Sequence, residues 1–238
     1  MDRSTKVGDA IILAGGFGTR LKSVSGGVPK SLMPVGDRVF LDFVLDKLVL
    51  AGLSRVHLSL HYKAEAFLDL VERRRHDIKI ILHKEEEPMG TGGAVNDVIS
   101  AHDVSKKFIV LNGDTYTNCD PLKLWQAFQS SDKLAMVSLA EVQETSRYGA
   151  VEFMNGRILG LAEKNCKGAG LINLGMYAFS RRAFGDMAGK FSLELDLLPR
   201  LVADNELFGF TFQETNFIDI GIPTDYRKFC NLAADNHV

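Results

Sequence analysis

The feature that most constrains the fold is an apolar run, Ala10 to Leu13, that leads directly into a glycine-rich segment. The apolar run predicts a buried strand, and the glycines predict a tight backbone loop at its C-terminal end. In an open α/β sheet, ligands bind at this end of the strands. Glycines let backbone N–H groups approach a phosphate closely, and Arg20 adds a planar cation suited to phosphate oxygens. The candidate ligand-binding residues of this stretch are Leu13, Ala14, Gly15, Gly16, Gly18, Thr19 and Arg20.

The spacing of the glycines distinguishes this loop from a dinucleotide-binding fingerprint. The segment has the pattern G-G-x-G-T-R instead of G-x-G-x-x-G, and Ser23, Gly26 and Pro29 prevent a helix from opening directly after it. A Rossmann oxidoreductase is therefore disfavoured. A second cation, Lys30, follows between Pro29 and Pro34. A phosphate-binding loop with two cations indicates a nucleoside-triphosphate site in an enzyme that activates a sugar phosphate.

Length and composition fit one soluble domain over residues 1–238. The chain is 46% hydrophobic and 24% charged, which allows a sizeable core. The formal net charge of −2 gives no electrostatic case for binding nucleic acid or a membrane surface. The sequence has no apolar signal core and no stretch of the roughly 18 apolar residues that a membrane helix needs. Three scattered cysteines, Cys119, Cys166 and Cys230, predict reduced thiols in a cytoplasmic protein. Nothing in the sequence decides whether the chain forms a homo-oligomer.

Apolar periodicity in the first half of the chain predicts strands that alternate with helices, which implies a parallel sheet. In the second half, Asn155-Gly156 between two strand-like runs predicts a tight hairpin. We therefore expect an α/β fold with a nucleotide-binding half over about 1–140 and a smaller, antiparallel half over about 141–238, to which the family resemblance described below assigns the binding of the sugar phosphate. Predicted strands cover 55–60, 78–82, 107–111 and 134–140, and predicted helices cover 40–51, 64–75, 94–101, 121–129 and a last segment that ends near 233.

Two motifs together resemble a known family. L-A-G-G-x-G-T-R-L followed by P-K-x-L-x-P is similar to the signature of the sugar-1-phosphate nucleotidyltransferases, also called sugar-nucleotide pyrophosphorylases. The resemblance covers nearly the whole chain. It implies a Rossmann-like (GT-A-like) three-layer α/β/α fold with a mostly parallel sheet and a smaller antiparallel sugar-binding lobe. It also implies catalysis that depends on Mg²⁺, with Arg20 on the leaving phosphates and Lys30 on the α-phosphate.

The segment from Glu85 to Gly93 resembles the E-P-L-G-T-A/G-G segment of guanylyl-transferring members of that family. Guanine presents adjacent N1–H and N2–H donors, and one carboxylate accepts both. We therefore expect Glu85 to recognise guanine, with Glu87 as the rival candidate and a solvated acidic turn as the alternative for this stretch. The glycines suggest a second backbone surface against the nucleotide, formed by Gly90, Thr91, Gly92 and Gly93.

Two aspartates are candidate metal ligands. A predicted strand runs into Asn112, Gly113 and Asp114, which puts a carboxylate at the C-terminal edge of the sheet and the two preceding residues near the nucleotide. Asp120, which precedes a proline, is a better helix cap and leaves Asp114 free for another role. Asp219 lies in an apolar strand, where a carboxylate without a partner is costly. The resemblance makes Asp114 and Asp219 ligands of Mg²⁺, which often combines one or two carboxylates with substrate phosphates.

Three further motifs occur in the order in which the family uses them around the sugar phosphate: R-Y-G-x-V, E-K and N-x-G-x-Y. The resemblance puts Gly149 along the sugar, Glu163 and Asn173 on sugar hydroxyls, and Lys164 on the phosphate. For Tyr148, contact with the ligand and packing in the core are equally good interpretations.

The implied reaction is in-line attack of a sugar-1-phosphate oxygen on the α-phosphorus of a nucleoside triphosphate, with release of pyrophosphate. The attacking oxygen is already an anion, so positioning and electrostatics carry the catalysis and no general base is needed. The catalytic candidates are Arg20, Lys30 and Asp114. The six histidines, at positions 57, 61, 76, 83, 102 and 237, receive structural roles.

Within the family, the compact length and the motifs L-I-N-x-G-x-Y, F-S-x-E and F-I-D-I-G-x-P-x-D-Y resemble the D-glycero-α-D-manno-heptose 1-phosphate guanylyltransferases. Those enzymes make GDP-heptose for bacterial capsule, S-layer or lipopolysaccharide glycans, so GTP and the heptose 1-phosphate are the expected substrates. The first alternative is a mannose-1-phosphate guanylyltransferase, or a uridylyl- or thymidylyltransferase for another sugar 1-phosphate. An alternative of a different class is a non-catalytic regulatory subunit that binds a nucleotide sugar, which the intact cations and aspartates disfavour.

Overall fold

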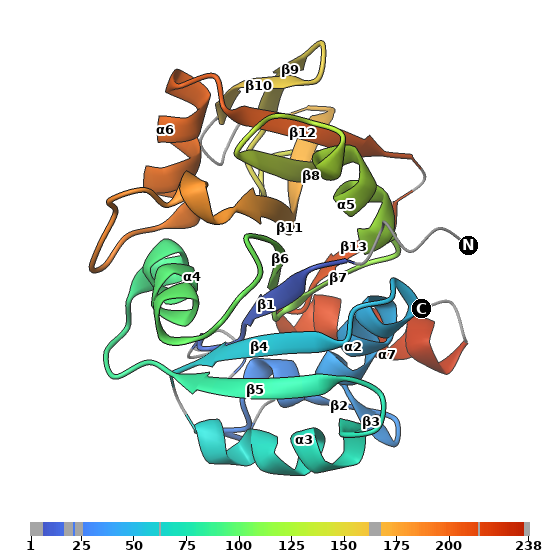
Figure 1. Ribbon diagram of the computed structural model, residues 1–238. Helices are drawn as coiled ribbons and strands as arrows, with labels where there is room; N and C mark the ends of the chain where they lie inside the picture. Colours follow the sequence, from blue (N-terminus) through green and yellow to red (C-terminus); the bar gives the residue numbers. More distant parts are fainter. Residues whose placement is uncertain are drawn as a thin grey trace.

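The computed structural model describes residues 7–16, 21, 26–61, 63–161, 168–213 and 215–235. In this part of the chain the largest sheet has nine strands in the order β5-β4-β1-β6-β11-β8-β12-β10-β9, and it runs through the whole molecule (Figure 1). The strands are β1 (Asp9–Leu13), β4 (Arg55–Leu60), β5 (Lys79–Lys84), β6 (Lys107–Asn112), β8 (Ala135–Val142), β9 (Val151–Met154), β10 (Arg157–Leu161), β11 (Gly170–Ser180) and β12 (Leu207–Phe212).

The directions of the strands divide the sheet into two halves. Strands β5, β4, β1 and β6 are parallel, as predicted for the first half of the chain. Beyond β6, strand β11 is antiparallel to β6 and β8, and β10 is antiparallel to β12 and β9. The expected antiparallel half is therefore present, but it continues the same sheet. One pair in it, β8 with β12, is parallel, and β11 on the other side of β8 runs antiparallel to both of these strands.

Helices cover both faces of the sheet, which is the predicted three-layer arrangement. Side chains of β1 alternate between the two faces: Ala10 and Ile12 belong to one apolar core and Ile11 to the other. The first core is completed by α2 (Phe40–Leu50), α3 (Leu68–Arg74), α5 (Pro121–Gln129) and α7 (Pro223–Ala234). The second is completed by α4 (Gly90–Ala101), the π-helical turn η6 (Leu193–Leu197) and α6 (Leu198–Ala203).

Two short ribbons and three 3-10 turns complete the elements of the described residues. β2 (Pro34–Val35) pairs with β3 (Arg38–Val39), and β7 (Thr115–Thr117) pairs with β13 (Phe217–Asp219). The second ribbon matters for the site, because it sets Asp219 opposite Thr115, the neighbour of Asp114. The 3-10 turns are η3 (Lys30–Leu32), η4 (Ala64–Phe67) and η5 (Arg181–Ala183).

Most predicted elements are confirmed, and two differ in an informative way. The helix expected over 64–75 is divided into η4 and α3, because Lys63 has a left-handed φ of 53° and the first turn closes with 3-10 hydrogen bonds. Helix α4 begins at Gly90 instead of residue 94, because the carbonyl of Phe191 accepts the N–H groups of Gly92 and Gly93 at 3.0 and 3.1 Å. Hydrogen bonds to Phe191 thus stabilise a helical start at Gly90, although glycine has a low intrinsic helix propensity.

Among the described residues, no helix combines the length and apolar character that crossing a membrane requires. Cys119 and Cys230 are free thiols in the structure, and Cys166 lies outside the residues that it describes.

Candidate functional site

A cavity of about 340 Å³ opens at the C-terminal ends of β1, β4, β5 and β6. Strand β1 has neighbours on both sides that come later in the chain, so this edge has the crevice in which open α/β sheets bind ligands. The sequence analysis expected a nucleotide here. The cavity is lined by Leu13, Ala14, Gly15, Gly16, Lys30, Ser31, His61, Glu85, Pro88, Gly90, Thr91, Ala94, Asn112, Gly113, Asp114 and Glu194.

The first residues of the glycine-rich loop are confined by the neighbouring strands. The amide of Ala14 donates to a carbonyl of β4 at 2.9 Å, and the amide of Gly113 donates to the carbonyl of Leu13 at 2.9 Å. A Cβ on Gly113 would lie 2.7 Å from that same carbonyl oxygen, so glycine is required where β6 passes the loop. A Cβ on Gly15 would lie 3.1 Å from Oε1 of Glu85. The predicted residues Gly18, Thr19 and Arg20 lie outside the residues that the structure describes.

Glu85 brings a buried carboxylate to the cavity wall, directly after β5. The residue is only 6% exposed, whereas its rival Glu87 is exposed and does not line the cavity. Oε1 accepts a hydrogen bond from the hydroxyl of Ser59 at 2.9 Å, and Oε2 accepts one from the amide of Met89 at 3.2 Å. A carboxylate has about four lone-pair sites, so these two bonds fix its orientation and leave capacity for a ligand.

His61 also lines the cavity, although the sequence analysis gave every histidine a structural role. It follows β4 directly, and its Nδ1 lies 3.4 Å from the backbone oxygen of Glu85. The sequence signal for His61 is its position directly after a strand. In each of the four parallel strands, the residue that follows the last strand residue lines this cavity.

The start of α4 forms another part of the wall. Gly90, with φ +72°, and Thr91 line the cavity, as the sequence analysis expected. Gly92 does not line it: a Cβ on Gly92 would lie 2.3 Å from the ring of Phe191. The segment after residue 189 packs against both Gly92 and Gly93, and their contact with a ligand stays a prediction.

Lys30 lies between the two predicted metal-ligating aspartates. Its Nζ is 2.5 Å from Oδ2 of Asp114 and 3.2 Å from Oδ1 of Asp219. Lys30 begins η3, which Pro29 precedes, while Asp114 follows β6 and Asp219 ends β13. The amide of Ile220 donates to the backbone oxygen of Asp114 at 3.0 Å and so fixes the two acidic segments side by side. Three side chains that are far apart in the sequence thus converge as predicted.

Glu194 is the acidic residue at the cavity that the sequence analysis did not select. Its Oε2 accepts from the hydroxyls of Thr91 and Ser192 at 2.9 and 3.1 Å, and its Oε1 accepts from the hydroxyl of Tyr177 at 3.1 Å. Burial raises the pKa of Tyr177 well above its usual value, and the nearby Glu194 charge adds to this, so the phenol remains a donor. The only sequence signal for Glu194 was its position in the F-S-x-E motif.

Three described residues were predicted to bind the sugar phosphate, and none of them lines the cavity. They are Tyr148, Gly149 and Asn173. Asn173 donates from Nδ2 to the hydroxyl of Tyr177 at 2.8 Å, which links it to Glu194. Tyr148 packs edge-on against Phe217 at 5.0 Å between ring centroids, and Gly149 has φ +82°. Tyr148 therefore has the packing role that was one of its two interpretations. Glu163 and Lys164 lie outside the described residues.

Comparison with known proteins gives the context for this site. D-glycero-α-D-manno-heptose 1-phosphate guanylyltransferase from Aneurinibacillus thermoaerophilus is 35% identical to the chain, and the match covers 92% of this chain and 96% of that protein. The enzyme with the same name from Campylobacter jejuni is 36% identical, with 92% and 97% covered. Both relatives match over nearly their whole length.

Among solved structures, HddC from Yersinia pseudotuberculosis complexed with GMP-PN superposes with a TM-score of 0.81. It is 39% identical to the chain, and the match covers 94% of this chain and 99% of that one. The family model described as "Nucleotidyl transferase" matches residues 9–236. This chain therefore belongs to the nucleotidyl transferase family.

Proposed function

We propose that this protein transfers GMP from GTP to D-glycero-α-D-manno-heptose 1-phosphate, which yields GDP-heptose and pyrophosphate. The observation that carries the proposal is the agreement between the cavity and the relatives. A buried carboxylate, a glycine loop and a lysine with two aspartates surround one cavity, in a chain that is 35–36% identical to two enzymes named for this reaction.

Glu85 is the proposed guanine-recognising group. A carboxylate that faces the cavity accepts from both N1–H and N2–H of guanine, whereas uracil and thymine present only one N–H donor. The hydrogen bonds from Ser59 and Met89 fix the orientation of the carboxylate before the nucleotide binds. Less conformational entropy is therefore lost on recognition. The loop residues from Leu13 to Gly16, together with Gly18, Thr19 and Arg20, are proposed to hold the triphosphate, with Arg20 on the leaving phosphates.

Asp114 and Asp219 are the proposed ligands of Mg²⁺. The donor set fits a hard divalent cation, since two carboxylates already hold a cationic group, the ammonium of Lys30, between them. Mg²⁺ bound there would supply positive charge against the phosphate oxygens. Lys30 lines the cavity and is proposed to contact the α-phosphate, where negative charge develops during the transfer.

The sugar is proposed to lie toward Glu194, which lines the same cavity as Glu85. Glu194 and Asn173 share the hydroxyl of Tyr177, so one buried phenol orients an acceptor and an amide for sugar hydroxyls. Gly149, Glu163 and Lys164 remain proposed sugar-phosphate contacts, and Lys164 is assigned to the incoming phosphate. No general base is required, because the attacking phosphate oxygen is already ionised.

Pyrophosphate release tests the proposal. The enzyme is incubated with Mg²⁺, one of four triphosphates (GTP, ATP, UTP or dTTP) and one of three sugars (the heptose, mannose or glucose 1-phosphates). We expect turnover with GTP and the heptose 1-phosphate, and at least about tenfold lower kcat/KM with mannose 1-phosphate, because one lost carbinol contact is worth roughly that much. Turnover with dTTP and glucose 1-phosphate would overturn the assignment. No turnover with any pair, together with tight binding of GDP-sugars, would favour the regulatory alternative.

A further inference from the structure

Among the described residues, the ion pairs of Lys30 join one cation to two acids. One ammonium is shared by two carboxylates, so the three groups together carry a net charge of −1. The lysine side chain is only 11% exposed, whereas the side chains of Asp114 and Asp219 are 39% and 31% exposed. The cation is therefore the most buried member of the cluster, whereas both acids are partly open to solvent and Asp114 also lines the cavity.

The surrounding backbone builds this geometry. Oδ1 of Asp219 accepts from the amide of Gly221 at 2.7 Å, and Oδ1 of Asp114 accepts from the hydroxyl of Thr115 at 3.3 Å. A Cβ on Gly221 would lie 2.8 Å from Oδ1 of Asp219 and 2.9 Å from Nζ of Lys30. Glycine at 221 thus provides the room in which the ammonium and the carboxylate meet.

From this geometry we propose that Lys30 and a divalent cation alternate between the same two carboxylates. Lys30 acts as a built-in countercharge that holds Asp114 and Asp219 together, and it gives up both acids when a divalent cation joins them. The inference rests on the proposed function, since it concerns the cation that the proposed reaction uses.

The contacts of Lys30 support the exchange. Mg²⁺ binds carboxylate oxygens directly, so an ion held by Oδ2 of Asp114 and Oδ1 of Asp219 would compete with Nζ for the same two oxygens. Two cations that contact the same oxygens also repel strongly where solvent screening is weak. Lys30 lines the cavity, so the released ammonium turns toward the region proposed for the α-phosphate. Cation binding and the delivery of Lys30 to the phosphate are then one event.

The first test measures Mn²⁺ affinity by EPR, with no nucleotide or sugar present. We expect Lys30→Met to bind Mn²⁺ at least about tenfold more tightly than the wild type, equivalent to about 1.4 kcal/mol. Lys107→Met is the matched control, since it removes the same charge at the start of β6, at the opposite edge of the sheet. Equal affinities of Lys30→Met and the wild type, or an equal gain in Lys107→Met, would overturn the proposal.

The second test uses the wild-type protein and does not depend on a variant that folds. The Lys30 ammonium is followed by NMR in protein with ¹⁵N-labelled lysine side chains, while Mg²⁺ is added. We expect the Nζ resonance that is absent in Lys30→Arg to shift in proportion to the bound cation. An unshifted resonance at saturating Mg²⁺ contradicts the exchange. Neither test uses turnover, so a failed substrate panel and a failed exchange remain distinguishable results.

Discussion

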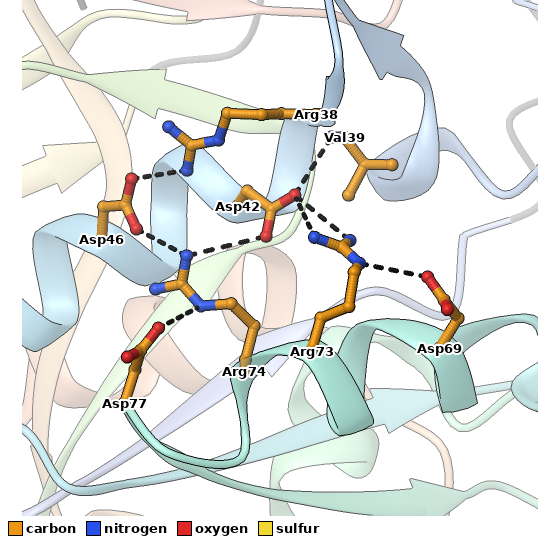
Figure 2. A network of polar contacts seen from close by, with 8 residues as sticks. All are labelled: Arg38, Val39, Asp42, Asp46, Asp69, Arg73, Arg74 and Asp77. Carbon is orange, nitrogen blue, oxygen red and sulfur yellow. Dashed lines mark hydrogen bonds and ion pairs between the residues drawn. The ribbon is translucent and has the colours of Figure 1, made fainter.

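Two clusters of charged residues in this molecule differ in the number of cations that contact each of their central acids. Figure 2 shows the first, between α2 and α3, where arginines from β3 and α3 surround aspartates of α2. Asp42, which is 1% exposed, contacts Arg73 at 3.3 Å and Arg74 at 3.6 Å. Asp46 contacts Arg38 at 2.5 Å and Arg74 at 2.6 Å. Each of these acids has two cations, whereas at the cavity one cation has two acids.

The difference separates a cluster that supports the fold from one that is suited to binding. For Asp46, burial opposes ionisation most strongly, but the hydrogen bonds and charges of Arg38 and Arg74 outweigh it and lower its pKa. Asp42 also accepts from the amide of Val39 at 3.1 Å, which caps the start of α2. Asp42 and Asp46 are thus each held by two arginines of neighbouring elements. Asp114 and Asp219 share the one ammonium of Lys30, and Asp114 lines the cavity.

The largest expected effect comes from neutralising an acid at the cavity. Asp114→Asn should lower kcat by about 10³-fold, because a carboxylate that anchors charge at the transferring phosphate is lost. The melting temperature should change by no more than about 3 °C, which corresponds to roughly 1 kcal/mol at this size. Steady-state kinetics and calorimetry on the same preparation check both values. A large loss of stability without a loss of kcat would erase the distinction between the two clusters.

The mirror experiment is Asp42→Asn. Arg73 and Arg74 would lose their shared buried acid, which costs about 3–5 kcal/mol, or roughly 10 °C in melting temperature. At a temperature where the variant is folded, kcat should stay within about twofold of the wild-type value. If Asp42→Asn removed activity and left the melting temperature unchanged, the α2–α3 cluster would belong to the site.

A buried histidine tests the comparison of the two clusters, because a side chain without hydrogen-bond partners is not by itself a binding site. His57 is fully buried, and neither ring nitrogen has a hydrogen-bond partner among the described residues. Burial lowers its pKa to about 4, so the folded state binds a proton less readily than the unfolded chain does. Stability is therefore full above about pH 6.5 and falls by about 3 kcal/mol as the pH drops toward 4.

Urea unfolding between pH 4 and 8 measures this dependence. His57→Leu should flatten the slope between pH 6.5 and 4 and cost little at pH 8, where no hydrogen bond of His57 is lost. An unchanged slope in the variant would assign the acid sensitivity to other groups.

The smallest expected effect concerns the phenol behind the cavity. Tyr177→Phe removes the hydroxyl that donates to Glu194 and accepts from Asn173, so KM for the sugar phosphate should rise about tenfold with KM for GTP unchanged. Tyr226→Phe is the control, because it also removes a tyrosine hydroxyl bond, to the backbone oxygen of Pro34 in β2. Equal effects of the two variants on the sugar KM would argue against a positioning role for Tyr177.

Much of the fold and the centre of the site could be predicted from the sequence, because those signals are local. The apolar run into glycines specified β1 and its loop, and Asp120 before Pro121 specified the start of α5, where Asp120 accepts from the amide of Leu122. The convergence of Lys30, Asp114 and Asp219 followed from motifs that lie at strand ends or beside prolines.

The rest depends on contacts between segments that no local pattern encodes. Glu194 reaches the cavity only because η6 packs beside the start of α4, where the Phe191 carbonyl accepts from Gly92 and Gly93. A run of glycines looks the same in the sequence whether a ligand or a phenylalanine ring presses against it. The binding and catalytic roles of all the predicted site residues remain predictions, and five of these residues, Gly18, Thr19, Arg20, Glu163 and Lys164, lie outside the described part of the chain.

The uninterrupted sheet has a mechanical consequence. Strands β6 and β11 join the two halves of the molecule through five paired residues, from Met176 opposite Leu111 to Ser180 opposite Lys107. A hinge between the halves would have to break that ladder, so the spacing between Asp114 at the end of β6 and the wall that holds Tyr177 is rigid. Any closing motion around bound substrates must come from the loops at the rim, and the rate of product release should respond to changes in those loops more than to changes in the sheet.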